Sequence, residues 1–155
     1  MTERPTPALD PQAVLLVEHG IRDTIARYAH HVDDGEFEAL SRLFTADGEF
    51  IIDRFDEVPN PLRGRRQIAE YLARSAEERT RDPLRGPYRR HHVSSTRVDV
   101  ETSTRARATS YFVAVMAHGP DHWGRYVDVF HLDDGRWRFA KRHVHVDGRI
   151  RRSST

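Results

Sequence analysis

The second half of the sequence constrains the fold most, because its hydrophobic pattern keeps the two-residue period of β-strands. Before Tyr88, apolar residues recur at steps of three and four, which is the period of an amphipathic helix. After Tyr88 the pattern predicts four strands in succession, joined by short turns. Helices followed by a run of antiparallel strands predict an α+β domain, with helices packed on one face of a curved sheet. The expected strands span residues 88–101, 105–117, 122–132 and 136–147.

The first half predicts three helices and one strand. Gly35 is expected to end the first helix, since glycine readily adopts the left-handed conformation found after a helix. A short second helix, a strand within residues 46–55 and a third helix near residues 61–79 follow. The first helix carries one apolar stripe, made of Val14, Val17, Ile21, Ile25, Tyr28 and Val32. The third helix is expected to bury Ile68, Tyr71 and Leu72.

Length and composition exclude several classes of protein. A chain of 155 residues is expected to form one domain with a substantial core. The net charge of +1 provides no overall attraction to nucleic acid, and the lack of cysteine excludes disulfides and thiolate chemistry. No apolar run is long enough to cross a bilayer, and residues 14–17 are too short for a signal-peptide core. We therefore expect a cytoplasmic protein with neither nucleic acid nor membrane as a partner.

Two positions on the first helix are candidates for chemistry. Tyr28 lies on the apolar stripe, so it points toward the sheet, either as a core tyrosine or as a pocket hydroxyl. Asp33 and Asp34 end the same helix, where the helix dipole disfavours negative charge. A turn-forming role before Gly35 explains one aspartate, whereas the other is expected to have a cationic partner.

Two adjacent histidines begin the first of the four strands. Because neighbouring strand residues point to opposite faces, His91 and His92 cannot share a role. The alternation places His91 with Val93 and Arg97, and His92 on the opposite face. Periodicity alone does not decide which histidine faces inward, and a structural histidine is the simpler interpretation of either.

Arg142 is the candidate buried cation. It shares a strand face with small and apolar residues, so it requires an anion, which is Asp33, Asp128 or a substrate. His143 and His145 occupy the other face, two residues apart. No carboxylate stands at ligand spacing beside them in the sequence, so no metal is expected.

Several of these segments together resemble a known family. The segments "IARYAHHVDDGEFEALSRLFTADGEF", "RHHVSSTRV" and "GRYVDVFHLDDGRWRFAKRHV" resemble the SnoaL-like branch of the nuclear transport factor 2-like superfamily. The most similar group contains scytalone dehydratase, bile-acid 7α-dehydratase and hexachlorocyclohexane dehydrochlorinase. The resemblance implies a cone-shaped α+β barrel, in which a strongly curved, mostly antiparallel sheet wraps around N-terminal helices and encloses a pocket. This domain would span residues 13–148, between an N-terminal arm (1–12) and a C-terminal tail (149–155).

The resemblance also implies an activity and the residues that perform it. The catalytic pair would be Asp33 and His91, which places His91 on the inner face, with Tyr28 and Arg142 stabilising developing charge. The protein would be a cofactor-independent lyase of the dehydratase type, or an isomerase, acting on a mostly apolar cyclic small molecule. The alternative is a non-catalytic ligand-binding or accessory subunit, similar to the small subunit of ring-hydroxylating dioxygenases. We further expect a homo-oligomer, a trimer or dimer, formed through the outer face of the sheet. Substrate contacts are expected from Tyr111, Asp128 and Phe55.

Overall fold

The computed structural model describes residues 9–53, 61–83 and 86–150, so Phe55 lies outside the described residues. Three helices come early in the chain: α1 (Pro11–Asp34), α2 (Phe37–Ser41) and α3 (Gly64–Arg81). The strands are β1 (Phe44–Asp53), β2 (Leu62–Arg63), β3 (Arg89–Thr102), β4 (Arg105–Met116), β5 (Gly119–Asp133) and β6 (Arg136–Arg149). The predicted α+β class and the order of the main elements are confirmed.

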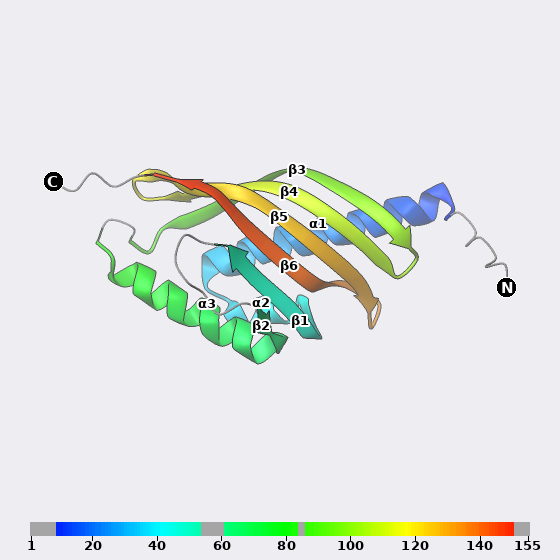
Figure 1. Ribbon diagram of the computed structural model, residues 1–155, viewed down its shortest axis with the longest axis horizontal. Coiled ribbons are helices and arrows are strands. Elements are labelled where there is room, and N and C mark those ends of the chain that lie inside the picture. The colour runs from blue at the N-terminus through cyan, green and yellow to red at the C-terminus, as the bar shows by residue number, and fades with distance from the viewer. Residues whose placement is uncertain (1–8, 54–60, 84–85, 151–155) are drawn as a thin grey trace.

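The strands form one curved sheet in the order β2-β1-β6-β5-β4-β3. Neighbouring strands are antiparallel except β1 and β6, which are parallel. Figure 1 shows the long strands β3 to β6 arching across α1, with α3 beside β1. The sheet is unclosed, because the edge strands β2 and β3 do not pair with each other in the described part of the chain. Its concave face and the helices enclose the core.

The ends of α1 follow from local sequence. The Asp10 side chain accepts a hydrogen bond from the Gln12 backbone N–H, and Pro11 is the first residue of the helix, where its missing N–H costs nothing. At the other end Gly35 adopts φ 76°, the left-handed conformation expected there. The predicted stripe is largely buried between these ends, and its buried apolar members are Val17, Ile21, Ile25, Tyr28 and Val32.

The hairpin between β5 and β6 fixes the register of the two central strands. Asp134 and Gly135 have φ values of 49° and 69°, as a two-residue type I′ turn requires. A register shift follows between Val129 and Phe130, where Ala140 is the extra residue on β6, and beyond this shift Asp128 lies directly opposite Arg142 in the ladder. Among the described residues, no helix is both long and apolar enough to span a membrane.

Candidate active site

Asp33 and His91 form a closely bonded pair at the point where the end of α1 meets the start of β3. His91 Nδ1 lies 2.6 Å from Asp33 Oδ1, and the His91 backbone N–H donates to Asp33 Oδ2 at 2.8 Å. Both side chains are almost fully buried. Because Nδ1 is held by the carboxylate, Nε2 is the ring nitrogen that remains to accept a proton.

Arg89 supplies the cation expected near the aspartate at the end of α1. Its guanidinium donates to the Val32 carbonyl, one of the last of the helix, and its Nε lies 3.6 Å from Asp33 Oδ1. Burial alone would raise the pKa of the Asp33 carboxyl, but the hydrogen bonds from His91 and the positive charge of Arg89 outweigh burial and lower it. Burial lowers the pKa of Arg89 to about 10, and nearby Arg79 contributes to that shift. Asp33 is therefore ionised at neutral pH, despite the unfavourable helix end.

His91 is held in its neutral form. Burial is the largest influence and lowers its pKa, and Arg89 and His122 lower it further, while the bond to Asp33 acts in the opposite direction. The net shift is downward from 6.5. A neutral imidazole whose Nδ1–H donates to a carboxylate presents a basic Nε2, which is the requirement for a general base.

The alternation along β3 places His91 inward and His92 outward, as the resemblance implied. The predicted alternation fails further along, because the strand has a bulge between Ser94 and Arg97, with Ser95 at φ 51°. The extra residue reverses the faces, so the Arg97 side chain is 77 % exposed instead of facing inward with His91. A β-bulge at a serine has no clear signature in sequence.

His91 lies in the wall of a cavity of about 260 Å³ between the helices and the concave face of the sheet. The lining of this cavity combines apolar and aromatic side chains with charged side chains, which come from the end of α3 and the residue after it, and from β3, β5 and β6. The apolar lining includes Val32, Phe50, Ile52, Leu72, Phe112, Met116, Val144 and Val146. The charged lining includes Glu78, Arg79, Asp82, Arg89, Asp121 and Arg149.

Two buried tyrosines also line the cavity. Tyr28 was expected from the sequence, and Tyr126 of β5 was not. Their rings meet edge to face with centroids 6.0 Å apart, and Tyr126 stacks on Phe112 at 4.5 Å. Burial raises the pKa of both tyrosines, although the charge of Arg142 lowers it in part. Both hydroxyls are therefore neutral hydrogen-bond donors at physiological pH.

Arg142 is fully buried and is not among the residues that line the cavity. The predicted role, stabilising charge that develops on a substrate, would require it to line the cavity. Its Nε and Nη2 donate to the two oxygens of Asp128 at 2.9 and 2.8 Å. The guanidinium carbon lies 4.1 Å from the Tyr28 ring centroid and 4.0 Å from that of Tyr126. Burial would lower the pKa of Arg142, but Asp128 raises it above its ordinary value. Arg142 therefore lies behind the tyrosines, and its partner is Asp128 rather than Asp33.

Two of the expected substrate contacts are not at the cavity. Asp128 is fully buried in the pair with Arg142, which leaves its carboxylate no access to a ligand. Tyr111 is 58 % exposed on the outer face of β4, because its neighbours Ser110 and Phe112 take the inward positions. Neither Asp128 nor Tyr111 therefore lines this cavity, so the structure gives no support to their predicted contact with a substrate, and Phe55 lies outside the described residues.

The cavity contains a second carboxylate–histidine pair that the sequence analysis missed. His122 Nδ1 lies 2.8 Å from Asp121 Oδ2, and both residues line the cavity. The His122 and His91 ring centroids are 6.4 Å apart. The adjacent letters "DH" at the start of a strand are common, and only the fold brings them opposite the first pair.

Fold and cavity together define the class of protein: an α+β protein of the nuclear transport factor 2-like superfamily, with a pocket between helices and sheet. The SnoaL-like domain model matches residues 13–143, so the chain belongs to the SnoaL-like family. No curated protein matches the chain.

Solved structures share this fold over most of their length. One is an Asp→Asn variant of Rv3472, a function unknown protein from Mycobacterium tuberculosis, with 26 % identity and a TM-score of 0.74, covering 93 % of this chain and 80 % of that one. Another is a putative scytalone dehydratase from Novosphingobium aromaticivorans, with 23 % identity, a TM-score of 0.73 and coverage of 92 % and 94 %. A third, from Catenulispora acidiphila in complex with S-DNPA, has 26 % identity, a TM-score of 0.67 and coverage of 86 % and 95 %.

Proposed function

We propose that this protein is an enzyme that removes a proton from a small, mostly apolar cyclic molecule and so catalyses an elimination, of the dehydratase type, or an isomerisation. The observation that carries the proposal is the 2.6 Å contact between His91 Nδ1 and Asp33 Oδ1 in the wall of a cavity. A histidine with one nitrogen held by an ionised carboxylate is a fixed, correctly tautomerised base. SnoaL-like family members are often cofactor-free isomerases, dehydratases or lyases.

The cavity suggests the class of substrate. Its volume is about 260 Å³. Since a cavity of about 150 Å³ admits benzene, this one has room for a compound of one or two rings. Its aromatic and aliphatic lining favours an apolar ring system, and the two tyrosine hydroxyls provide polar contacts for a carbonyl or a hydroxyl group. The Catenulispora neighbour in complex with S-DNPA supports ligand binding by this fold.

The residues divide the chemistry in the following way. His91 Nε2 accepts the proton next to a carbonyl, while Tyr28 and Tyr126 donate hydrogen bonds to the oxygen on which negative charge develops. His122, held by Asp121, is the acid that protonates the departing hydroxyl or returns the proton at a new carbon. Arg142 does not line the cavity, but its guanidinium packs against the rings of Tyr28 and Tyr126. It therefore acts through the two tyrosines, as a positioning residue.

Proton abstraction can be tested before the natural substrate is known. A panel of cyclic ketones with a β-hydroxyl group is incubated with the protein in D₂O, and deuterium incorporation and elimination are followed by NMR. We expect exchange with the wild-type protein and its loss in His91→Ala, whereas His92→Ala is the matched control because that side chain lies on the outer face of the same strand. Equal rates in both variants, or no exchange with any member of the panel, would contradict the proposal and favour a non-catalytic binding protein.

A further inference from the structure

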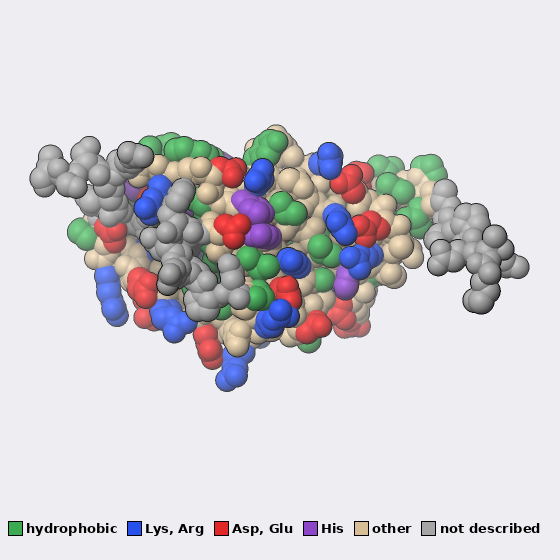
Figure 2. Space-filling view, in the orientation of Figure 1, with side chains coloured by type: hydrophobic (Ala, Val, Ile, Leu, Met, Phe, Trp, Pro, Cys, Tyr) green, Lys and Arg blue, Asp and Glu red, His purple; other side chains and the backbone are tan. Residues whose placement is uncertain are grey.

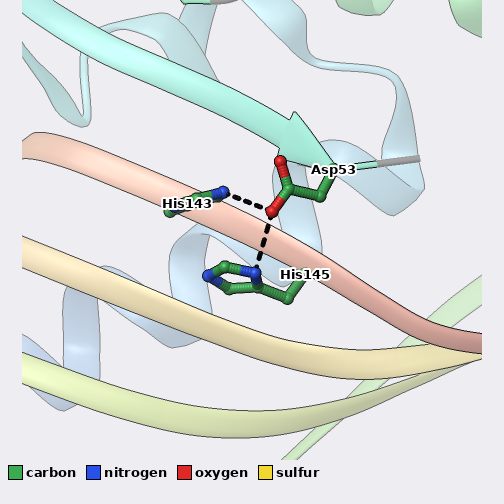
Figure 3. Close-up of side chains that lie close together, drawn as sticks. All are labelled: Asp53, His143 and His145. Atoms are coloured by element: carbon green, nitrogen blue, oxygen red, sulfur yellow. Dashed lines mark hydrogen bonds and ion pairs between the residues drawn. The ribbon is translucent and has the colours of Figure 1, made fainter. Parts of the chain in front are cut away.

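Three side chains with metal-ligating atoms converge on the outer face of the sheet, away from the cavity. His143 and His145 are two residues apart on β6, so their side chains project to the same face. The parallel register of β1 and β6 places Asp53 opposite His145 and Ile51 opposite His143. As Figure 3 shows, both imidazole rings therefore reach the carboxylate at the end of β1. The carboxylate that the local sequence lacks is supplied by another strand.

The three ligand atoms lie close enough together to surround one transition-metal ion. His143 Nε2 lies 2.8 Å and His145 Nδ1 lies 2.9 Å from the same oxygen, Asp53 Oδ2. The three ligand atoms all lie within 4.8 Å of one another. Around a tetrahedral zinc ion with bonds of about 2.0–2.1 Å, neighbouring ligand atoms are about 3.4 Å apart. Small side-chain rotations would therefore place an ion between the three atoms without a change in the backbone.

The surroundings leave the cluster open on one side. The two histidine side chains are each 25 % exposed and Asp53 is 50 % exposed, so water can complete a coordination shell. None of the three residues lines the cavity, and the cluster is separate from the proposed catalytic pair. Arg125 lies opposite His145 in the ladder of β5 and β6, and its guanidinium is 4.0 Å from the Asp147 carboxylate. In the space-filling view, histidine side chains lie beside acidic ones near the middle of the face turned toward the reader, among mixed charges (Figure 2).

We propose that Asp53, His143 and His145 bind a divalent transition-metal ion of the zinc type, with water in the remaining positions. Two imidazoles and one carboxylate form a donor set that suits zinc and its neighbours in the first transition row, rather than magnesium or calcium. By joining β1 to β6, a bound ion would stabilise the only parallel strand pair among the described residues. This site is independent of the proposed elimination chemistry.

The test uses the full chain, purified without an affinity tag and treated with a chelator, and titrated with Zn²⁺ by calorimetry. We expect one ion per chain, an affinity reduced more than tenfold in His145→Ala and in Asp53→Asn, and a melting temperature raised by Zn²⁺ only in proteins that retain the cluster. His19→Ala is the matched control, because His19 is an exposed histidine on α1. It should bind Zn²⁺ as the wild-type protein does.

A second measurement keeps the test decisive if the alanine variant unfolds. Asp53→Asn preserves the shape of the side chain at an exposed strand end, and Co²⁺ bound at the site should give a visible absorption band that this variant lacks. The absence of Zn²⁺ heat above dilution would overturn the proposal, as would a ratio other than one ion per chain. Equal affinity in His145→Ala and the wild-type protein would also overturn it and would mean that the three side chains only hydrogen-bond to one another.

Discussion

Removing the Arg142 charge alone is expected to destabilise the fold, whereas removing it together with Asp128 is not. Both side chains are fully buried and joined by two hydrogen bonds of 2.9 and 2.8 Å. Arg142→Met keeps a long side chain that can pack against the surrounding aromatic rings, but it leaves the carboxylate without its partner. Breaking a buried pair from one side costs about 3–5 kcal/mol. For a domain of this size, that corresponds to a fall in melting temperature of about 6–20 °C.

The double variant Arg142→Met/Asp128→Leu removes both buried charges and fills the space with apolar groups. Such replacements are often neutral or stabilising by about 1–4 kcal/mol, because neither ion has to be taken out of water. We therefore expect the double variant to recover most of the stability that the single variant loses. The assay is urea unfolding at neutral pH, followed by circular dichroism, for the wild-type protein, both single variants and the double variant. The coupling free energy of the resulting cycle should exceed about 2 kcal/mol.

Two results would refute this reasoning. If Arg142→Met alone lowers the free energy of unfolding by less than about 1 kcal/mol, the carboxylate has found another partner or is protonated at little cost. If the double variant is as unstable as the sum of the single variants, the guanidinium contributes mainly through its contacts with the rings of Tyr28, Tyr126 and Phe139 rather than through Asp128. The first result would mean that the pair contributes little to stability, and the second would mean that Arg142 stabilises the fold by packing.

Four further predictions follow from the geometry. Asp33→Asn should lower kcat by several orders of magnitude, up to about 10⁴-fold, because the tautomer of His91 is no longer fixed. A loss of less than tenfold would contradict the catalytic pair. Since the pKa of folded His91 is lowered, the base is neutral above that value, and kcat/KM should fall with decreasing pH only below 6.5, as a pH–rate profile will show. Gly124→Ala should destabilise the fold by at least about 1–3 kcal/mol in thermal unfolding, because a Cβ at this position would lie 1.9 Å from the His145 carbonyl oxygen. Unchanged stability would mean that β5 and β6 move apart there at little cost. The protein is expected to form a homo-oligomer through the outer face of the sheet, where Val127 is 41 % exposed. Val127→Arg should lower the molar mass measured by light scattering toward that of the monomer. A monomeric wild-type protein would refute this prediction.

Local interactions explain why much of the architecture could be predicted from sequence. The apolar stripe of α1, the left-handed Gly35 that ends it and the Asp134–Gly135 turn each depend on residues close together in the chain. The α+β class follows from the change of hydrophobic period after Tyr88, since each period is a property of one element. The inward position of His91 was obtained only from the family resemblance, because strand alternation leaves the choice of face open.

The tertiary structure decided the contacts that depend on strand order and register. The register of β5 against β6 gives Arg142 its partner Asp128, and the pairing of β1 with β6 brings Asp53 to His143 and His145. These contacts join residues 14 to 92 positions apart. The sequence therefore determined which elements form and which of their faces are apolar, because those properties are local. Only the folded sheet determined the partners of the buried and surface charges, because strand order and register are set by the packing of the whole chain.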